Sequence, residues 1–414
     1  MSEARISVTS EIGRLRSVVC HTPGEELLAV TPSTREDFLY DDIIDLEQAA
    51  REHHRFKAIL ARFSVVHEVR DLLETIADYP EVRPFLIEKV FDVARSEPLS
   101  RQLHDLPASD LVGLFIEGRA SQGGPLQDIL NVTSYDLPPL PNLFFTRDAA
   151  MVIGSGVIIA SMRYNVRWTE EILMKALFQY HPLLKNDGVV YDGSQERRTG
   201  YTVEGGDIHV LRSDLVLMGL SERSTAGAFD VMAEKLIREQ GVSDIIVVVL
   251  PSNRAMIHLD MVFTMIDREH CVVFQPMFVG PSRCAVLHYQ AGRAGMREMP
   301  DLFSALREVG MPLEPIFCGG SQRPLQEREQ WSSGCNFTAL RPGLIMGYDR
   351  NEHTYEELKR EAGYRIVSSI DYLTGDDTIE DDERAVIVFE GGELVRGGGG
   401  ARCMTMPVHR DDPW

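Results

Sequence analysis

The sequence predicts an α/β fold built from a repeated strand–strand–helix–strand (ββαβ) unit. Three observations support this prediction: the order of elements recurs from about residue 140 onward, glycines follow the predicted helices, and polar residues recur where each unit begins. Repeats spaced by about 20–50 residues are typical of repeat architectures. The pattern therefore favours a pseudo-fivefold α/β propeller with blades around a central cavity. The alternative is an ordinary α/β protein in which the spacing is coincidental.

Apolar runs and their periodicity define the units. The strands are predicted over 143–153, 157–162, 207–211, 215–220, 245–250, 259–266, 271–275, 313–317, 336–340, 344–348 and 364–368. The helices are predicted over 169–180, 226–239, 302–309 and 355–362. Gly241, Gly310 and Gly363 follow three of these helices, as expected of residues that end a helix in the left-handed conformation. Thr169, followed by two glutamates, is predicted to be an N-cap.

A fifth unit is expected at the two ends of the chain. It comprises a strand over 15–21, a helix over 45–62 and a strand over 65–69. The segment after Cys403 would supply its missing strand and close the ring. Apolar positions at helical spacing predict a small helical insertion, so the domains are predicted to be 1–70 and 122–414 for the propeller and 71–121 for the insertion.

Composition limits the classes of function. The net charge of −21 over 414 residues argues against general nucleic-acid binding, which needs basic surfaces. No apolar run approaches the length of a membrane span, and the N-terminus lacks the apolar core of a signal peptide. The six cysteines are scattered without a CxxC pair, which predicts a cytoplasmic protein without disulfides or zinc.

The end of the chain carries the candidate nucleophile. Four consecutive glycines, 397–400, precede Ala401, Arg402 and Cys403. Such a run suits a backbone that approaches a ligand closely or a loop that moves. A neighbouring arginine favours the thiolate, so Cys403 is predicted to be reactive. The alternative is a flexible tail with an incidental cysteine.

Polar residues recur near the start of the first strand of each unit. They are Asn142, Asp148, Glu204, Asp207, His258, Asp260 and Asn336. Converging carboxylates would hold a cation, and the planar guanidinium group with its five donors fits them well. A thiolate suits attack on that poorly electrophilic carbon, with His258 as general acid and base. Period-two spacing predicts that His258 and Asp260 share one face of a strand.

Each of these features also has a structural alternative. Asp148 beside Arg147 could be a surface ion pair, and Glu204 to Asp207 a simple turn. The His258–Asp260 pair alone could be structural or half of a metal site. A metal is disfavoured because no second histidine lies nearby at ligand spacing. The joint pattern is what favours catalysis.

Motifs along nearly the whole chain resemble those of the arginine deiminases, in the guanidine-modifying (pentein) superfamily. The matching segments are TPS at 31–33, YDD at 40–42, PNLFFTRD at 141–148, EGGD at 204–207, LSERS at 220–224, HLD at 258–260, REQW at 328–331 and RCMTMP at 402–407. Together they are highly specific, although most are weak singly. The resemblance implies the pentein fold, with its helical insertion in the first repeat.

The resemblance also implies a role for each matched position. Cys403 matches the nucleophile, His258 the general acid and base, and Glu204 the carboxylate that assists it. Asp148 and Asp260 match the pair that grips the guanidinium. The remaining matches are Arg167 and Arg223 for the substrate α-carboxylate, Asn142 and Asn336 for further substrate contacts, and Asp207 as a supporting acid.

The implied reaction is hydrolysis of L-arginine to L-citrulline and ammonia through a covalent amidino-cysteine, without a metal or organic cofactor. One rival is an amidinotransferase of the same superfamily, which passes the amidino group to an amine. A second is another substrate, such as agmatine or a methylated arginine; the two arginines argue against agmatine, which lacks a carboxylate. A third is a non-catalytic arginine-binding protein, which would not need Cys403 or His258. A homo-oligomer is expected, with no nucleic-acid or membrane partner.

Overall fold

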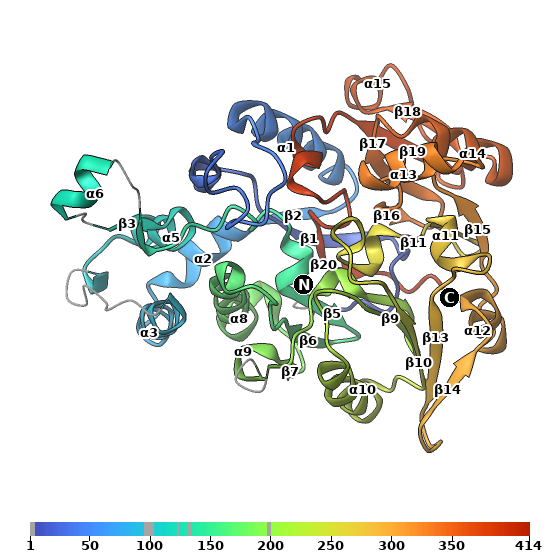
Figure 1. The fold of residues 1–414 in the computed structure, drawn as a ribbon, viewed down its shortest axis with the longest axis horizontal. Coiled ribbons are helices and arrows are strands. Elements are labelled where there is room, and N and C mark those ends of the chain that lie inside the picture. The colour runs from blue at the N-terminus through green and yellow to red at the C-terminus, as the bar shows by residue number, and fades with distance from the viewer. Residues whose placement is uncertain (1–4, 95–102, 122–123, 131–133, 197–199) are drawn as a thin grey trace.

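The computed structural model describes residues 5–94, 103–121, 124–130, 134–196 and 200–414 (Figure 1). These residues form a mixed α/β fold with one two-stranded sheet and five larger sheets of three to five strands. Nowhere in the described ranges does a helix combine the length and the apolar character needed to cross a membrane.

Four of the larger sheets contain the predicted strand–strand–helix–strand order. In each, the first two strands pair in antiparallel fashion and the connecting helix leads to a parallel strand. The strands are β5 (Ala150–Ile153), β6 (Gly156–Ile159), β7 (Val189–Asp192), β8 (Ile208–Arg212), β9 (Leu215–Leu220), β10 (Asp244–Val249), β11 (Phe263–Met265), β12 (His270–Val273), β15 (Glu314–Phe317), β16 (Thr338–Arg341), β17 (Leu344–Tyr348) and β18 (Arg365–Ser368). The helices are α8 (Trp168–Tyr180), α10 (Ala226–Gln240), α12 (Leu302–Glu308) and α14 (Glu352–Ala362).

Three strands outside the predicted pattern enlarge these sheets. The strand β19 (Ala385–Phe389) inserts between β17 and β18 and pairs with both in parallel fashion. The hairpin of β13 (Ala285–Gln290) and β14 (Met296–Met299) extends the sheet of β8 to β10. Each of the four sheets therefore contains the repeated unit, and two of them carry additional strands.

The two ends of the chain meet in the fifth sheet. The strand β1 (Leu15–Cys20) pairs in parallel with β2 (Val65–Glu68) and in antiparallel fashion with β20 (Met406–Arg410). The C-terminal segment after Cys403 thus supplies the third strand, as predicted. The helix α1 (Leu46–Leu60) connects β1 to β2 and is capped by Asp45, whose side chain accepts a hydrogen bond from the Gln48 amide at 2.7 Å.

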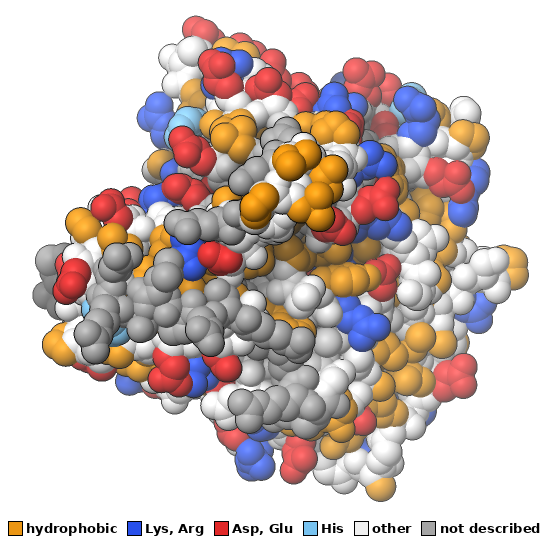
Figure 2. All heavy atoms as spheres, turned by 60° about the vertical axis from the view of Figure 1, so that its left-hand side comes forward, with side chains coloured by type: hydrophobic (Ala, Val, Ile, Leu, Met, Phe, Trp, Pro, Cys, Tyr) orange, Lys and Arg blue, Asp and Glu red, His pale blue; other side chains and the backbone are white. Residues whose placement is uncertain are grey.

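A group of helices follows β2 and projects to the left of the sheets in Figure 1. They are α2 (Val69–Ala77), α3 (Val82–Ala94), α5 (Ala108–Glu117) and α6 (Pro125–Leu130), with the hairpin of β3 (Arg119–Ala120) and β4 (Tyr135–Leu137). Hydrophobic and charged side chains of both signs are interspersed on this face (Figure 2). The division into 1–70, 71–121 and 122–414 stays a prediction, and residues 1–4, 95–102 and 122–123 lie outside the described ranges.

The remaining helices are short elements at strand ends. They are α7 (Thr146–Ala149), α9 (Gly193–Glu196), α11 (Gln275–Phe278), α13 (Arg323–Trp331) and α15 (Ser369–Thr374). The 3₁₀ turns are η1 (Glu25–Ala29), η2 (Asn165–Arg167), η3 (Pro182–Leu184), η5 (Gly205–Asp207), η6 (Arg254–Met256), η7 (Leu259–Met261) and η8 (Leu394–Gly397).

Two predicted strands are interrupted by such turns, and both interruptions matter for the site. The run 143–153 contains α7 before β5, and 259–266 contains η7 before β11. Asp207 accepts a hydrogen bond from the Leu259 amide at 2.9 Å, which satisfies that amide outside a strand ladder. The prediction that period two places His258 and Asp260 on one strand face is therefore wrong. The predicted N-cap Thr169 is also wrong, because α8 begins at Trp168.

Candidate active site

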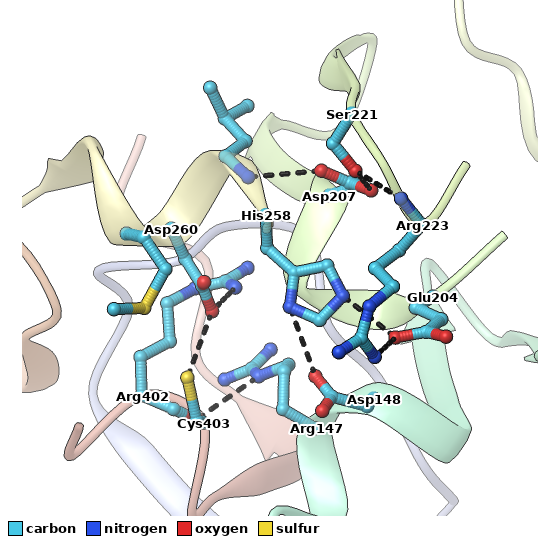
Figure 3. A network of polar contacts seen from close by, with 12 residues as sticks. Arg147, Asp148, Glu204, Asp207, Ser221, Arg223, His258, Asp260, Arg402 and Cys403 are labelled. Carbon is cyan, nitrogen blue, oxygen red and sulfur yellow. Dashed lines mark hydrogen bonds and ion pairs between the residues drawn. The ribbon is translucent and has the colours of Figure 1, made fainter. Parts of the chain in front are cut away.

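All ten predicted site residues are buried, each at most 5% exposed. Most of them lie in the short turns that precede the strands. Asp148 belongs to α7, Glu204 directly precedes η5, His258 directly precedes η7, and Asp260 lies within η7. Cys403 lies just before β20. Figure 3 shows that these residues converge from separate segments of the chain.

The Glu204–Asp207 turn requires its two glycines. A side-chain carbon on Gly205 would lie 2.0 Å from the carbonyl oxygen of Arg147. One on Gly206 would lie 2.5 Å from Nδ1 of His258. The backbone of η5 therefore packs directly against α7 and against the candidate general acid, where no larger residue fits.

His258 lies between two carboxylates. Its Nε2 is 2.8 Å from Oε2 of Glu204 and its Nδ1 is 3.7 Å from Oδ1 of Asp148. Burial by itself would lower the pKa of His258, but the charges of Asp148 and Glu204 outweigh burial and raise it to about 9. The ring is therefore an imidazolium at neutral pH and can donate a proton.

Glu204 is held as a carboxylate by its surroundings. Burial opposes ionisation, but Arg223, whose Nη1 donates to Oε2 at 3.1 Å, and His258 together hold the pKa of Glu204 well below its usual value. The amide of Arg163 donates to Oε1 at 2.9 Å. Glu204 can thus remain charged while it orients His258.

Two buried carboxylate oxygens are without a hydrogen-bond partner. Oδ2 of Asp148 accepts from Nη1 of Arg167 at 2.7 Å, and Oδ2 of Asp260 accepts from Nη1 of Arg402 at 2.9 Å. The Oδ1 atom of each aspartate is buried and accepts none. Because an unpaired buried acceptor is costly, these atoms are suited to receive the N–H groups of a bound cation.

Cys403 is positioned by Asn336. The side-chain Nδ2 of Asn336 is 3.2 Å from Sγ, and its Oδ1 accepts from the Cys403 amide at 3.2 Å. Sγ also lies 3.5 Å from Oδ2 of Asp260. Burial, followed by the charges of Asp260 and Asp148, raises the pKa of the thiol well above its usual value.

The predicted stabilisation of the thiolate by Arg402 is present, because its charge lowers the pKa of the thiol, but burial and the two aspartates outweigh it. The guanidinium of Arg402 points to Asp260, and its charge is balanced there and by Glu11. Its effect on the thiol is smaller than the effects of burial and the two aspartates. Arg402 is next to Cys403 in the sequence, but its guanidinium forms ion pairs with Asp260 and Glu11.

The predicted carboxylate-binding arginines both line the cavity next to Cys403. Arg167 donates to both oxygens of Glu170, at 2.9 and 2.8 Å, in addition to Asp148. Arg223 stacks its guanidinium over the ring of Tyr164, 4.9 Å from the centroid, and its Nε is buried without a hydrogen-bond partner. Arg223 thus keeps a free donor, whereas the donors of Arg167 are largely engaged.

Three further predicted residues use their side chains to bind other parts of the protein around the site. Asn142 lines the cavity, but its side-chain amide donates to the Phe38 carbonyl at 2.9 Å. Asn336 contacts Cys403 from outside the cavity lining. Asp207 accepts from the hydroxyls of Ser221 and Ser224, both at 2.6 Å, and burial raises its pKa to about 7. Asn336 and Asp207 are not part of the cavity lining in this structure, and neither are Glu204 and Asp260, which lie directly behind His258 and Cys403.

The cavity is closed in this structure. Its volume is about 20 Å³, which is room for about one water molecule and not for an amino acid. Leu39, Arg254 and the glycines 397–399 form part of its wall, and ion pairs of Arg254 with Asp41 and of Arg396 with Asp42 join these segments. A wider groove of about 1390 Å³ shares Arg254 and Gly398 with this wall.

The carboxylates could in principle attract a metal ion. Ligand atoms of Asp148, Glu204 and His258 lie within 4.8 Å of one another. The same carboxylates already pair with Arg167, Arg223 and the protonated His258. Such a balanced set offers a divalent cation little net negative charge. The absence of a metal stays a prediction.

Comparison with known proteins identifies the family. A model of the family described as arginine deiminase matches residues 36–410. The chain is 32% identical over 433 aligned residues to an arginine deiminase of Borrelia garinii, with 98% of each chain covered. The chain belongs to the arginine deiminase family. Another arginine deiminase, from Treponema denticola, is 32% identical with 99% of each chain covered.

Solved structures share the fold with this member of the arginine deiminase family at much lower identity. The product-bound N-terminal domain of ArgZ, a cyanobacterial arginine dihydrolase, is 14% identical with a TM-score of 0.52, covering 95% of this chain and 97% of that one. SxtG, an amidinotransferase from Microseira wollei, is 14% identical with a TM-score of 0.54, covering 98% and 97%. At such identities the likeness concerns the fold alone.

Two buried glutamates that hold site arginines in this deiminase-family chain are not among the predicted site residues. Glu170 was assigned only to the first turn of a helix, yet it pairs with Arg167 three residues earlier. Glu11 was not singled out, although it pairs with Arg402 across 391 positions of sequence. The i, i+3 spacing could have revealed Glu170, but no local signal marks Glu11.

Proposed function

We propose that this protein is an arginine deiminase, which hydrolyses L-arginine to L-citrulline and ammonia. The observation that carries the proposal is that Asp148 and Asp260 each keep a buried Oδ1 atom without a hydrogen bond, while the two carboxylates lie beside the ring of His258 and the thiol of Cys403, respectively. A guanidinium offers N–H donors in the fixed planar arrangement that two such acceptors can bind. Family membership supports the same substrate.

The reaction begins with binding of the guanidinium. Burial, Asp260 and Asp148 hold the pKa of the Cys403 thiol high, and the positive charge of the substrate compensates the two aspartates, so substrate binding favours loss of the thiol proton to solvent. Sγ then forms a bond to the guanidinium carbon. The His258 imidazolium gives its proton to one terminal amino group, the carbon–nitrogen bond breaks, and ammonia leaves.

The second half releases the product. The carbon now forms an amidino-cysteine that carries the rest of the substrate. Neutral His258 takes a proton from water as the water oxygen attacks this carbon. The carbon–sulfur bond breaks, Cys403 leaves as a thiolate, and citrulline is formed. The O–H proton on the product carbon is released to solvent, the thiolate of Cys403 regains a proton after citrulline leaves, and His258 is again an imidazolium, so the cycle needs no redox cofactor.

We propose further that the five larger sheets form the blades of a pseudo-fivefold propeller with the helices of 71–121 as an inserted domain. The recurrent strand order and the β1–β20 pairing of the chain ends support this arrangement. We also propose a cytoplasmic location, because all six cysteines are free thiols. Assembly into a homo-oligomer stays a prediction.

The test is to incubate purified protein with L-arginine and to measure citrulline and ammonia. Equimolar release of both supports hydrolysis, whereas turnover that requires an added amine would indicate an amidinotransferase instead. Cys403→Ser should bind arginine without turnover, because a hydroxyl is a far weaker nucleophile. Acid-quenched protein should carry an adduct on Cys403 equal in mass to arginine minus ammonia. Wild-type turnover by Cys403→Ser would remove this residue from the mechanism.

A further inference from the structure

Glu11 forms a two-point ion pair with an arginine next to the nucleophile. It is 7% exposed and lies in the segment before β1, distant in sequence from every motif of the site. Its Oε2 and Oε1 atoms accept hydrogen bonds from Nε and Nη2 of Arg402, both at 3.1 Å. Nη2 also donates to the carbonyl of Ile208 at 2.7 Å.

This pairing determines how Arg402 contacts Asp260. With the Nε–Nη2 edge occupied by Glu11, only Nη1 reaches Asp260, at 2.9 Å from Oδ2. Oδ1 of Asp260 accordingly remains buried without a hydrogen bond. A guanidinium free of Glu11 could turn the same edge toward Asp260 and bind both of its oxygens, as arginine–carboxylate pairs commonly do.

We propose that Glu11 is a positioning residue that keeps one oxygen of Asp260 available for the substrate guanidinium by holding Arg402 through its opposite edge. This inference rests on the proposed deiminase function, because it assigns the free oxygen to that substrate. Glu11 touches neither substrate nor Cys403, and it acts only through Arg402.

Glu11 also balances a cluster of buried positive charge. Arg147 approaches it to 3.9 Å, and the charges of Arg402 and the buried Arg410 act on the same region. His209 also faces this cluster, and burial lowers its pKa well below the usual value, so it adds no charge. Glu11 is therefore the carboxylate that, with Asp260, offsets the nearby arginines.

Removal of the Glu11 charge should have two effects, which are weaker binding of the substrate guanidinium and easier ionisation of the Cys403 thiol. Arg402 would bind Asp260 more fully, so the substrate guanidinium would lose an acceptor and meet more positive charge. The thiol of Cys403 faces Asp260, Asp148, Arg402, Arg147 and the hydroxyl of Tyr348. It would ionise more easily because Arg402 would then neutralise Asp260 more fully. A role in folding alone would not lower the pH at which the thiol reacts.

The experiment compares wild type with Glu11→Gln. We expect KM for arginine to rise at least about tenfold with a smaller change in kcat, as is expected when an interaction that binds the substrate is lost. The rate of Cys403 alkylation by iodoacetamide, located by mass spectrometry without substrate, should reach its midpoint at lower pH than in wild type. An unchanged KM, or a midpoint that stays or moves upward, would overturn the inference.

Two further variants make the comparison decisive. Asp244→Asn removes a buried carboxylate that pairs with His288 at 2.7 Å, outside the cavity lining, and should change neither KM nor the alkylation midpoint. Glu11→Asp keeps the charge with a shorter reach, so KM should rise while the midpoint stays as in wild type. If Glu11→Gln does not fold, a wild-type KM in Glu11→Asp overturns the inference. An inactive wild type would refute the proposed function, whereas active wild type with unaffected Glu11 variants would refute only this inference.

Discussion

The site residues form a set of buried charges that balance one another. Arg167 satisfies Asp148 and Glu170, and Arg223 satisfies Glu204, which in turn holds His258. Breaking one member of a buried ion pair costs several kcal/mol because the other charge is left unpaired. Substitutions here should therefore act on more than the contact that is removed.

Arg223 is the sharper test of a clamp for the substrate α-carboxylate. Arg223 lines the cavity, and its buried Nε makes no hydrogen bond and lies 3.9 Å from Oε1 of Glu222, so Arg223→Ala should raise KM for arginine about tenfold or more. Agmatine lacks the carboxylate, so its kcat/KM should change much less and the preference between the two should narrow. Arg167→Ala should impair both substrates, since Arg167 also holds Asp148.

The measurement is kcat/KM for arginine and agmatine in each variant. Arg163→Ala is the control, because Arg163 is an exposed arginine in the segment that carries Arg167. Equal loss on both substrates in Arg223→Ala would show that Arg223 is structural and that no carboxylate clamp exists at this position.

His258 should titrate well above an ordinary histidine. Its pKa of about 9 depends on Asp148 and Glu204, so Glu204→Gln should move the titration to lower pH. An unfolded histidine titrates near 6.5, so the contribution of His258 to stability is complete below about pH 6.5 and is lost as pH rises through 9. NMR of ring-labelled protein measures the midpoint directly. A midpoint at or below 6.5 would contradict the imidazolium assigned to the resting enzyme.

At the scale of elements, the site depends on irregular backbone at strand ends. The turns α7, η5 and η7 replace the first residues of expected strands and carry Asp148, Glu204 and His258 into one space. The approach to Cys403 is also irregular, and Tyr348 donates a hydrogen bond to the carbonyl of Gly399 at 3.0 Å. These irregular elements contribute to the site by fixing the backbone positions from which its side chains project.

Gly400→Ala should lower kcat by about tenfold to a hundredfold, since small displacements of reacting groups cost that much. The new methyl would lie 2.8 Å from both Cβ and Oδ1 of Asn336, the residue that positions Cys403. Gly392→Ala is the control, because its nearest neighbour would be Oε1 of Glu52 at an ordinary 3.7 Å. Steady-state kinetics compares the two, and a normal kcat in Gly400→Ala would show that this close approach is dispensable.

At the scale of the whole molecule, the nucleophile is held by the pairing of the chain ends. The strand β20 begins three residues after Cys403 and pairs with β1 near the start of the chain. Arg410 of β20 donates to the carbonyls of Gly13, at 2.7 Å, and Ala339, at 2.8 Å. Folding of the first and last segments and formation of the site are therefore linked.

Met406→Ala should reduce the free energy of unfolding by about 2–4 kcal/mol, the usual cost of truncating a buried side chain. Met406 is fully buried where β20 meets β1. Met296→Ala truncates a methionine that is 41% exposed and should change stability by less than about 0.5 kcal/mol. Urea unfolding of the two variants tests this. Equal stability would mean that the β1–β20 junction contributes little to the fold.

The sequence by itself determined the repeated unit, the approximate bounds of its strands and helices, and the candidate site residues. Strands such as Leu215–Leu220 and Leu344–Tyr348 were predicted with their observed bounds, because continuous apolar runs between glycines and polar turns are local signals. The motifs around Cys403 and His258 identified the family for the same reason, since the chemistry fixes residue types at short spacings.

Only the tertiary structure decided which charges meet. It replaced the first residues of the expected strand at 259–266 with the turn η7, where the carboxylate of Asp207 from another segment binds the Leu259 amide. It directed Arg402 to Asp260 and Glu11 instead of the neighbouring thiol, and it raised the thiol pKa through burial. Hydrogen bonds and electrostatic effects depend on distance in space, and a pairing across 391 positions leaves no local pattern in the sequence.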